Sequence, residues 1–417
     1  MSRGTFRQRR LIGLAASRRG FATIGAACAA LLSSCSAPEA RFSTIQDLPA
    51  ELRSSVALRL TSRGEDEGYW MQLDVDQRLA GDLLERPVLI PFEDERPGSE
   101  PGRRGRPVVR ASIWPVGDGA PMVVPAVVDT GAASTLILSR DAARHVDAWL
   151  SAEIGPHEGI GFVGPVPAGI GLVRRLEIGP LVLAPAEVKV NTEQAGVSAS
   201  VGLSAFMVFG GLVFDWENHV IVALPRGRAV RIDPGWAEVA WGPMPQVDLR
   251  ESRAGAAIRE GAGGAEGSLD TGEVGPSWSI RPTFSGMPVV QAAIAGEPLR
   301  TVLDTGGDGH LASLRPLAVE ERGRRRLVGS HGRIRAMREH ALDGVVRVGS
   351  VEFANPTVVV PDPDVDDKGE SEASLQYFDA VIGVELLRHQ AVWFDFERGA
   401  VRFWTGQGPL PALMGSR

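Results

Sequence analysis

Cysteine and histidine are scarce in this 417-residue chain, which contains two cysteines and seven histidines. Both cysteines, Cys28 and Cys35, lie among the first 35 residues, so the rest of the chain has no thiol to act as a nucleophile, zinc ligand or disulfide partner. His157-Glu158 lacks a second histidine one helical turn later, and no other histidine has convincing ligand spacing. We therefore expect no metal site and no cofactor, and a cysteine peptidase is excluded.

Two further classes of protein are disfavoured. No serine lies in a Gly-x-Ser-x-Gly sequence, the nucleophile turn of many hydrolases. The formal net charge is -7, and the two basic runs, Arg103–Arg106 and Arg322–Arg326, are short and contain no aromatic residue. We expect these runs in solvated loops and expect no nucleic-acid partner. The 50 glycines and 29 prolines separate many short Val/Ile/Leu runs, which favours β-structure over a helical bundle.

The N-terminal segment resembles a bacterial export signal. Basic residues precede Ser17–Phe21, which resembles a twin-arginine signal, and an apolar run follows at Ala22–Leu32. This run is too short to span a bilayer comfortably, and it ends in Leu32-Ser33-Ser34-Cys35, which resembles a lipoprotein box. We predict a signal peptide over residues 1–35 and lipidation of Cys35, which would anchor the protein to a periplasm-facing membrane. Ser36 slightly favours the outer membrane. Sec and Tat export stay open, and a retained N-terminal membrane helix is the alternative.

Five short sequences recur in the same order in two parts of the chain, which we call the first and second copies. The first recurrence aligns Pro107–Ile113 with Pro288–Ile294, an offset of 181 residues, and the other offsets lie between 170 and 181. Loop insertions and deletions explain such a small drift. The other paired sequences are Val127–Gly131 with Val302–Gly306, Glu177–Gly179 with Arg347–Gly349, Val201–Leu203 with Ile382–Val384, and Phe214–Glu217 with Phe394–Glu397.

The repeat divides the chain into segments. We predict a first lobe over residues 87–241, a Gly-rich linker over 242–277, a second lobe over 278–406 and a C-terminal tail over 407–417. Residues 36–86 form an N-terminal extension that matches nothing in the repeat. A membrane spacer, a propeptide and an accessory layer are all compatible with this extension, in which Asp47–Leu58 has a helical pattern.

Both copies have the pattern of short strands. Residues alternate between apolar and polar over Val108–Ile113, which predicts a half-buried strand. Val123–Val128 and Leu299–Leu303 are mostly apolar, as expected of strands covered on both faces, and each leads into an Asp-Thr-Gly sequence. The carboxylates of Asp129 and Asp304 are therefore predicted to lie at strand ends.

Two carboxylates can hydrolyse an amide without a metal or a covalent intermediate. One accepts a proton from water while the other donates a proton to the substrate carbonyl. Like charges about 4 Å apart repel by ~4 kcal/mol at an effective dielectric near 20, so such a pair shares one proton over a broad pH range. We predict that Asp129 and Asp304 are the catalytic pair, and we assign the shared proton to neither.

The residues after each aspartate suit this chemistry. Gly131 and Gly306 let backbone N–H groups approach the carboxylates where a Cβ would intrude. Thr130 and Thr305 can form hydrogen bonds across the junction and hold the loops rigid. We therefore predict that these four residues support the aspartate pair.

At these residues the chain resembles the aspartic peptidases, and the bacterial retropepsin-like family more than the pepsins. The resemblance depends on Asp129–Ala132 followed by Ser134–Leu136, on Asp304–Gly306, and on the apolar-apolar-Gly sequences ending at Gly202 and Gly383. It covers about Pro87 to Trp404. It implies a mostly β, bilobal acid-protease-like fold with two β-barrel-like lobes related by a pseudo-twofold axis and the active site between them. Gly202 and Gly383 would lie behind the active loops, in the ψ-shaped strand crossing of each lobe.

The second loop departs from the family pattern, with Gly307 where alanine or serine is usual. Asp308 lies where retropepsins often place a carboxylate that binds substrate backbone, with a solvated turn as the alternative. Ala132, in the first loop, is a further substrate-binding candidate. A third triplet, Asp270-Thr271-Gly272, follows a Gly-rich run without a preceding strand, and we interpret it as a loop turn.

Substrate binding would require flaps, for which Gly159–Gly171 and Leu327–Met337 are the candidates. Ile160, Phe162 and Val163 line a peptide groove or pack in the core, and the sequence favours neither. The predicted function is an aspartic endopeptidase acting on peptide or protein substrates, with a monomer sufficient for a complete site. One alternative is an inactive lipid-anchored peptide-binding or scaffold protein, and another is a site built by Asp129 from each of two molecules.

Overall fold

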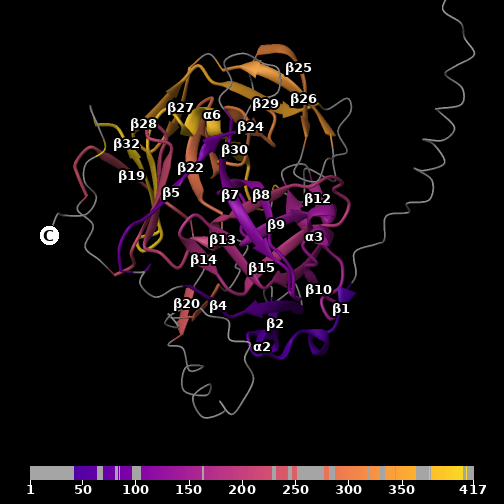
Figure 1. Ribbon diagram of the computed structural model, residues 1–417. Helices are drawn as coiled ribbons and strands as arrows, with labels where there is room; N and C mark the ends of the chain where they lie inside the picture. Colours follow the sequence, from indigo (N-terminus) through magenta and orange to yellow (C-terminus); the bar gives the residue numbers. More distant parts are fainter. Residues whose placement is uncertain are drawn as a thin grey trace, which may run out of the picture. The chain divides into compact units, whose positions relative to one another are not determined.

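The structure is a computed structural model of the chain, and strands account for most of its secondary structure (Figure 1). The α-helices in the described part of the chain are short: α2 (Ala50–Arg53), α3 (Arg140–His145) and α6 (Val384–Leu387). The predicted signal peptide and Cys35 lie outside the described residues. The structure describes residues 42–62, 69–79, 83, 85–95, 105–161, 164–227, 232–242, 247–250, 277–280, 287–317, 320–328, 334–342, 344–362, 375, 377–406 and 410.

The first copy forms most of a large mixed sheet. Its strand order is β1-β10-β12-β15-β9-β16-β8-β7-β13-β14, with β11 paired to β12 and β6 to β7. The strands are β1 (Phe42–Ser43), β6 (Glu93–Asp94), β7 (Pro107–Trp114), β8 (Met122–Asp129), β9 (Leu136–Ser139), β10 (Trp149–Ser151), β11 (His157–Gly161), β12 (Gly164–Val173), β13 (Arg175–Ile178), β14 (Leu181–Leu183), β15 (Ala186–Asn191) and β16 (Ala199–Gly202).

The second copy forms a nine-stranded sheet in the order β25-β26-β29-β24-β30-β23-β22-β27-β28. The path β26-β29-β24-β30-β23-β22-β27-β28 repeats the path β12-β15-β9-β16-β8-β7-β13-β14 element by element. Both paths are open, so the described strands form no closed barrel, unlike the barrel-like expectation. The strands are β22 (Val289–Ile294), β23 (Glu297–Leu303), β24 (Leu311–Ser313), β25 (Glu320–Val328), β26 (Ile334–Ala341), β27 (Val345–Val348), β28 (Val351–Ala354), β29 (Thr357–Pro361) and β30 (Ala380–Ile382).

A six-stranded sheet joins strands from both copies in the order β19-β32-β31-β17-β18-β5. Its central pair is antiparallel, with Gly211 opposite Asp395 and Phe214 opposite Val392. The Phe214 ring stacks on Trp216 and meets Phe394 edge-on, with centroids 5.4 and 5.8 Å away. Burial of these aromatic rings therefore stabilises the contact between the two copies. The strands are β5 (Val88–Pro91), β17 (Gly211–Asp215), β18 (Val220–Leu224), β19 (Trp236–Ala240), β31 (Val392–Asp395) and β32 (Ala400–Trp404).

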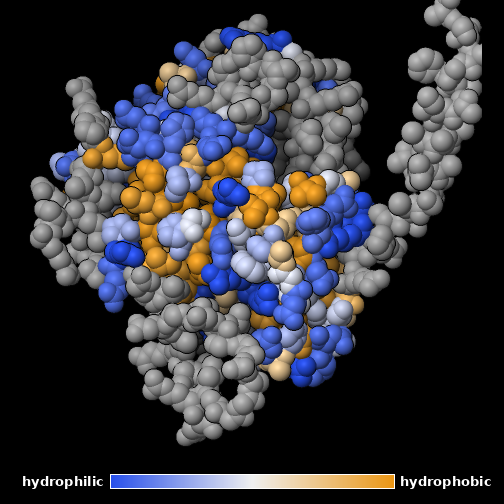
Figure 2. Space-filling view, in the orientation of Figure 1, coloured by the Kyte–Doolittle hydropathy of each residue, from blue (hydrophilic) through white to orange (hydrophobic). Residues whose placement is uncertain are grey.

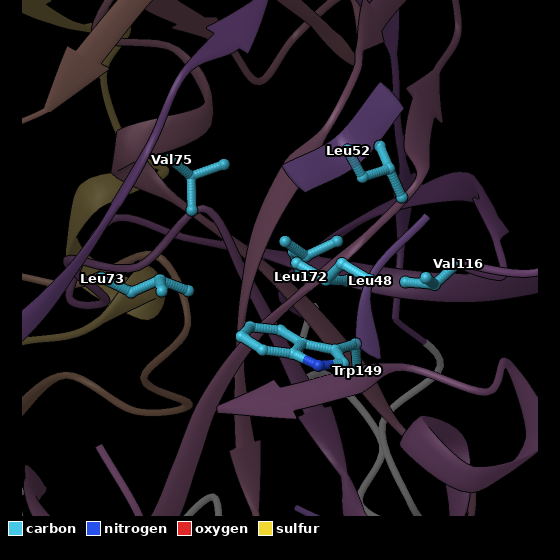
Figure 3. Close-up of a cluster of buried hydrophobic side chains, with 7 residues drawn as sticks. All are labelled: Leu48, Leu52, Leu73, Val75, Val116, Trp149 and Leu172. Carbon is cyan, nitrogen blue, oxygen red and sulfur yellow. The ribbon is translucent and has the colours of Figure 1, made fainter. Parts of the chain in front are cut away.

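The N-terminal extension packs against the first large sheet as an accessory layer. Leu48 and Leu52 are almost fully buried, and Figure 3 shows Leu48 and Leu172 next to the Trp149 ring. The predicted helix over 47–58 is too long, because α2 ends at Arg53 and a strand begins at Val56. The extension contains η1 (Ile45–Asp47), β2 (Val56–Ser62), β3 (Tyr69–Val75) and β4 (Gln77–Arg78); β4 pairs with β21 (Ser277–Ile280), which pairs with β20 (Val247–Arg250) at the ends of the predicted linker.

One strand is less covered than its apolar sequence predicts. β8 alternates between buried and exposed positions, and Val123 has 47% of its surface exposed, so the prediction of two covered faces is wrong for this strand. In β23 both Val302 and Leu303 are buried, as expected. Figure 2 shows hydrophobic residues gathered near the centre of the visible face, with hydrophilic residues bordering them. No helix in the described part of the chain is long and apolar enough to cross a membrane.

Candidate active site

Asp129 and Asp304 are placed by equivalent strand pairings. β8 runs parallel to β16, with Asp129 opposite Gly202. In the second copy β23 runs parallel to β30, and the Asp304 N–H donates to the Ile382 carbonyl at 2.9 Å. Each aspartate therefore lies where a strand gives way to its Asp-Thr-Gly loop, as the sequence predicts.

Gly202 and Gly383 lie directly behind these loops. A Cβ on Gly202 would lie 2.0 Å from the Ser134 carbonyl oxygen, and one on Gly383 would lie 2.5 Å from that of Gly309. The residues that follow the two glycines anchor the loops in the same way. Leu203 N–H donates to the Ala132 carbonyl and Val384 N–H to the Gly307 carbonyl, each at 2.9 Å. Only glycine allows the backbone to pass this closely.

The two loops are locked together by their threonines. Thr130 Oγ1 accepts a hydrogen bond from the Thr305 N–H at 3.0 Å and donates to the Leu303 carbonyl at 2.7 Å. Thr305 Oγ1 in turn accepts from the Thr130 N–H at 3.1 Å and donates to the Val128 carbonyl at 2.6 Å. Both threonines are fully buried, so the four hydrogen bonds hold the two loops in one fixed geometry.

The structure brings the carboxyl groups of Asp129 and Asp304 into hydrogen-bonding contact. Burial raises the pKa of Asp129 well above its usual range, and the adjacent Asp304 carboxyl adds to the rise. The guanidinium of Arg106 and the N–H of Gly131 lower the pKa of Asp129, but they do not outweigh the first two effects. The raised pKa favours the protonated form of the Asp129 carboxyl next to Asp304.

Each carboxyl also has a distinct hydrogen-bonding environment. Asp304 Oδ1 accepts from the Gly306 N–H at 2.7 Å. Asp129 Oδ1 is buried and has no partner among the described residues. A buried oxygen of this kind is satisfied by a proton or a water molecule, and both are reactants in an amide hydrolysis.

Two charged pairs lie next to the loops. Arg106 binds Glu95 through two hydrogen bonds, Nε to Oε2 at 2.6 Å and Nη2 to Oε1 at 2.8 Å, and its Nη1 donates to the Gly306 carbonyl at 3.2 Å. Arg388 donates through Nη2 to Asp94 Oδ2 at 3.1 Å. Sequence reasoning missed all four side chains and assigned the run containing Arg106 to a solvated loop. The only signal for Arg106 was its position next to the repeat that starts at Pro107.

The predicted substrate-binding residues fall into several environments. Ala132 is buried beside the first loop, while Asp308 is exposed and lies close enough to Arg106 to raise the pKa of that guanidinium. Ile160 lies in β11, where the structure describes the backbone alone. Phe162 and Val163 lie outside the described residues, as does Asp270-Thr271-Gly272.

Both segments predicted as flaps belong to antiparallel hairpins. Gly161 pairs with Gly164 at the end of β11–β12, and Val328 pairs with Ile334 at the end of β25–β26. In Figure 1 the β25–β26 hairpin is drawn in orange at the top of the view. The hairpins occupy corresponding places in the two sheets, because β12 pairs with β15 and β26 pairs with the equivalent strand β29.

The described residues contain no group of three or more metal-ligating side chains close enough to hold an ion. The described groups at this site are the two carboxyl groups, the surrounding backbone N–H groups and Arg106. No protein-family model matches this chain, and no curated protein matches it either.

Proposed function

We propose that the protein is an aspartic endopeptidase in which Asp129 and Asp304 activate a water molecule for attack on a peptide bond. The observation that carries this proposal is the contact between the two carboxyl groups, fixed by the reciprocal Thr130 and Thr305 hydrogen bonds. In such a pair the ionised carboxylate takes a proton from water while the protonated carboxyl donates to the carbonyl oxygen of the substrate.

We further propose that each large sheet is the core of one lobe of a bilobal acid-protease-like fold, with the six-stranded sheet joining the lobes. The matching strand orders and the antiparallel β17–β31 pair support a pseudo-twofold relation between the copies. In this proposal β11–β12 and β25–β26 are the flaps that close over a peptide. A single chain would hold a complete site, because Asp304 already occupies the place that Asp129 of a second molecule would need.

Gly307, the departure from the family pattern, is compatible with activity. A Cβ at this position would lie 3.0 Å from Asp304 Oδ2, so glycine leaves the carboxyl more room than alanine would. The contact between the two carboxyl groups favours hydrolysis over the binding-only alternative, which has no physical need for two acids in contact. Lipidation of Cys35 and a periplasm-facing location complete the proposal.

The decisive experiment incubates residues 36–417 with a diverse peptide mixture between about pH 4 and 7. Asp129→Asn and Asp304→Asn are compared with Asp118→Asn, a matched control because the Asp118 side chain is fully exposed. We expect the parent and the control to cut the same bonds and both site variants to lose at least about 1,000-fold of the rate. Cutting that persists in either site variant contradicts a shared pair. Binding without cutting by the parent favours the scaffold alternative.

A further inference from the structure

Arg106 connects the two copies next to the aspartate pair. It lies directly before β7 of the first copy, and Glu95, which directly follows β6, binds its guanidinium. The Glu95 N–H also donates to the Arg106 carbonyl at 2.8 Å. The free edge of the guanidinium reaches the Gly306 carbonyl of the second copy. Gly306 lies against Asp129, since a Cβ there would be 2.4 Å from Asp129 Cγ.

Arg388 makes the reverse connection. It follows α6 of the second copy and reaches Asp94 and the Gly105 carbonyl of the first copy, at 3.1 and 3.5 Å. Its side chain is 5% exposed, and its guanidinium carbon lies 5.9 Å from the centre of the Trp216 ring. Arg388 therefore supports the segment that carries Arg106, and the two arginines cross between the copies in opposite directions.

Neither arginine is repeated in the other copy. With the offset of 181 residues, Met287 corresponds to Arg106 and Met207 corresponds to Arg388. Met287 precedes β22 as Arg106 precedes β7, and its carbonyl accepts from the Trp241 indole at 3.0 Å. The site is thus duplicated in its aspartates, threonines and glycines, but among the described residues the arginine that reaches the opposite loop, Arg106, is present on one side alone.

We propose that Arg106, held by Glu95, is a positioning residue that fixes the Gly306 loop under Asp129 and places a single cation on one side of the aspartate pair. The effects that we expect on reaction rates rest on the proposed peptidase function. The position of Arg106 and its effect on the titration of the pair do not depend on that proposal. The two aspartates then have different electrostatic environments although their loops are alike.

The charges around the pair determine the expected pH effect. The described charged groups that act on Asp129 are Asp304 and Arg106, and Arg106 in turn lies near Glu95 and Asp308. Arg106 lowers the pKa of Asp129, so removing its charge raises the pH at which Asp129 gives up its proton. The limb of a pH–rate profile that reports this proton then moves to higher pH.

The test uses the full-length chain in detergent and the variant Arg106→Met, which introduces the residue found in the second copy. Infrared difference spectra against Asp129→Asn follow the protonated carboxyl band of the pair during a pH titration. We expect the midpoint to rise by about half to one pH unit in Arg106→Met. Where the parent cuts peptides, kcat falls about tenfold with little change in KM, and the pH–rate profile moves by the same amount.

Arg106→Lys and Arg347→Met are the controls. Lysine keeps the charge but cannot make the three hydrogen bonds, so we expect the parent titration with a reduced kcat. Arg347 forms an exposed ion pair with Glu352, and its replacement leaves both readouts unchanged. An unchanged titration midpoint in Arg106→Met overturns the inference. If the parent cuts no peptide, the peptidase proposal fails, while the infrared titration still decides the role of Arg106.

Discussion

Gly306 and Asp129 approach each other so closely that a Cβ on Gly306 would lie 2.4 Å from Asp129 Cγ. The reciprocal approach is similar, with a Cβ on Gly131 2.6 Å from Asp304 Cγ. These distances are shorter than any stable non-bonded contact, so each glycine sets the position of the aspartate in the opposite loop. The close packing around the pair thus depends on the absence of a methyl group in both copies.

Gly306→Ala should therefore separate the two carboxyl groups. We expect the rate of peptide cleavage to fall at least about 100-fold, because displacing reacting groups by an ångström has effects of that size. Peptide cleavage at pH 5 is the measurement. Gly117→Ala is the matched control, since a Cβ at Gly117 meets no atom within 4 Å. Activity within threefold of the parent would contradict the importance of this contact.

Thr130→Ala should destabilise the protein as well as the site. The substitution removes the acceptor for the Thr305 N–H, which stays buried without a partner, and the donor to the Leu303 carbonyl. We expect a decrease of about 1–3 kcal/mol in the free energy of unfolding, measured by urea denaturation. Thr130→Ser keeps the hydroxyl and should retain most of that free energy. Equal losses in both variants would show that the methyl group, rather than the hydrogen bonds, is responsible.

Glu187 makes the stability of the folded protein depend on pH. Burial raises the pKa of Glu187 from 4.5 to about 7, and Asp74 of the N-terminal extension adds to the rise, which Lys189 partly offsets. Since the folded state favours the protonated acid, the contribution of Glu187 to stability is fully present below about pH 4.5 and is lost as the pH rises through about 7. We predict that Glu187→Gln is more stable than the parent by about 1–3 kcal/mol at pH 8 and similar to it at pH 4.5.

Urea unfolding at the two pH values checks the role of Glu187. Glu217→Gln is the control, because Glu217 is exposed on the surface and its replacement should leave the pH dependence unchanged. If the free energy of unfolding has the same pH dependence in the parent and in Glu187→Gln, Glu187 is not the cause of that dependence.

Leu52→Ala tests whether the N-terminal extension is part of the folded unit. Leu52 is 1% exposed in the cluster around Trp149, so we expect a loss of about 2–4 kcal/mol in the free energy of unfolding. Leu89→Ala should change it by less than about 0.5 kcal/mol, because Leu89 is 59% exposed. A negligible effect of Leu52→Ala would instead fit a loosely attached spacer or propeptide.

The sequence predicted the strand leading to each aspartate because local patterns specify it. The alternation over Val108–Ile113 matches β7, whose residues alternate between buried and more exposed positions. Short repeated sequences located the two Asp-Thr-Gly loops and the two glycines behind them. All of these features are encoded within a few consecutive residues, so they can be read without knowledge of the fold.

Arg106 could not be predicted in this way. Its partner at Gly306 is a backbone carbonyl 200 residues away, which any residue could supply, and no local pattern distinguishes Arg106 from the other arginines in its run. The helix predicted in the N-terminal extension was too long for a related reason. Its sequence is compatible with a longer helix, but Val56 begins a strand that pairs with β3. Tertiary pairing outweighs helix propensity there.

The shared six-stranded sheet has a consequence for folding. Gly211 of β17 pairs with Asp395 of β31, and β31 and β32 are the last strands in the part of the chain that the structure describes. During synthesis, β17 is made some 180 residues before β31, the strand with which it pairs. The sheet can therefore be completed only after the C-terminal strands have been synthesised. A chain without β31 and β32 would leave the edge of β17 unpaired and the Phe214 ring without its contact to Phe394.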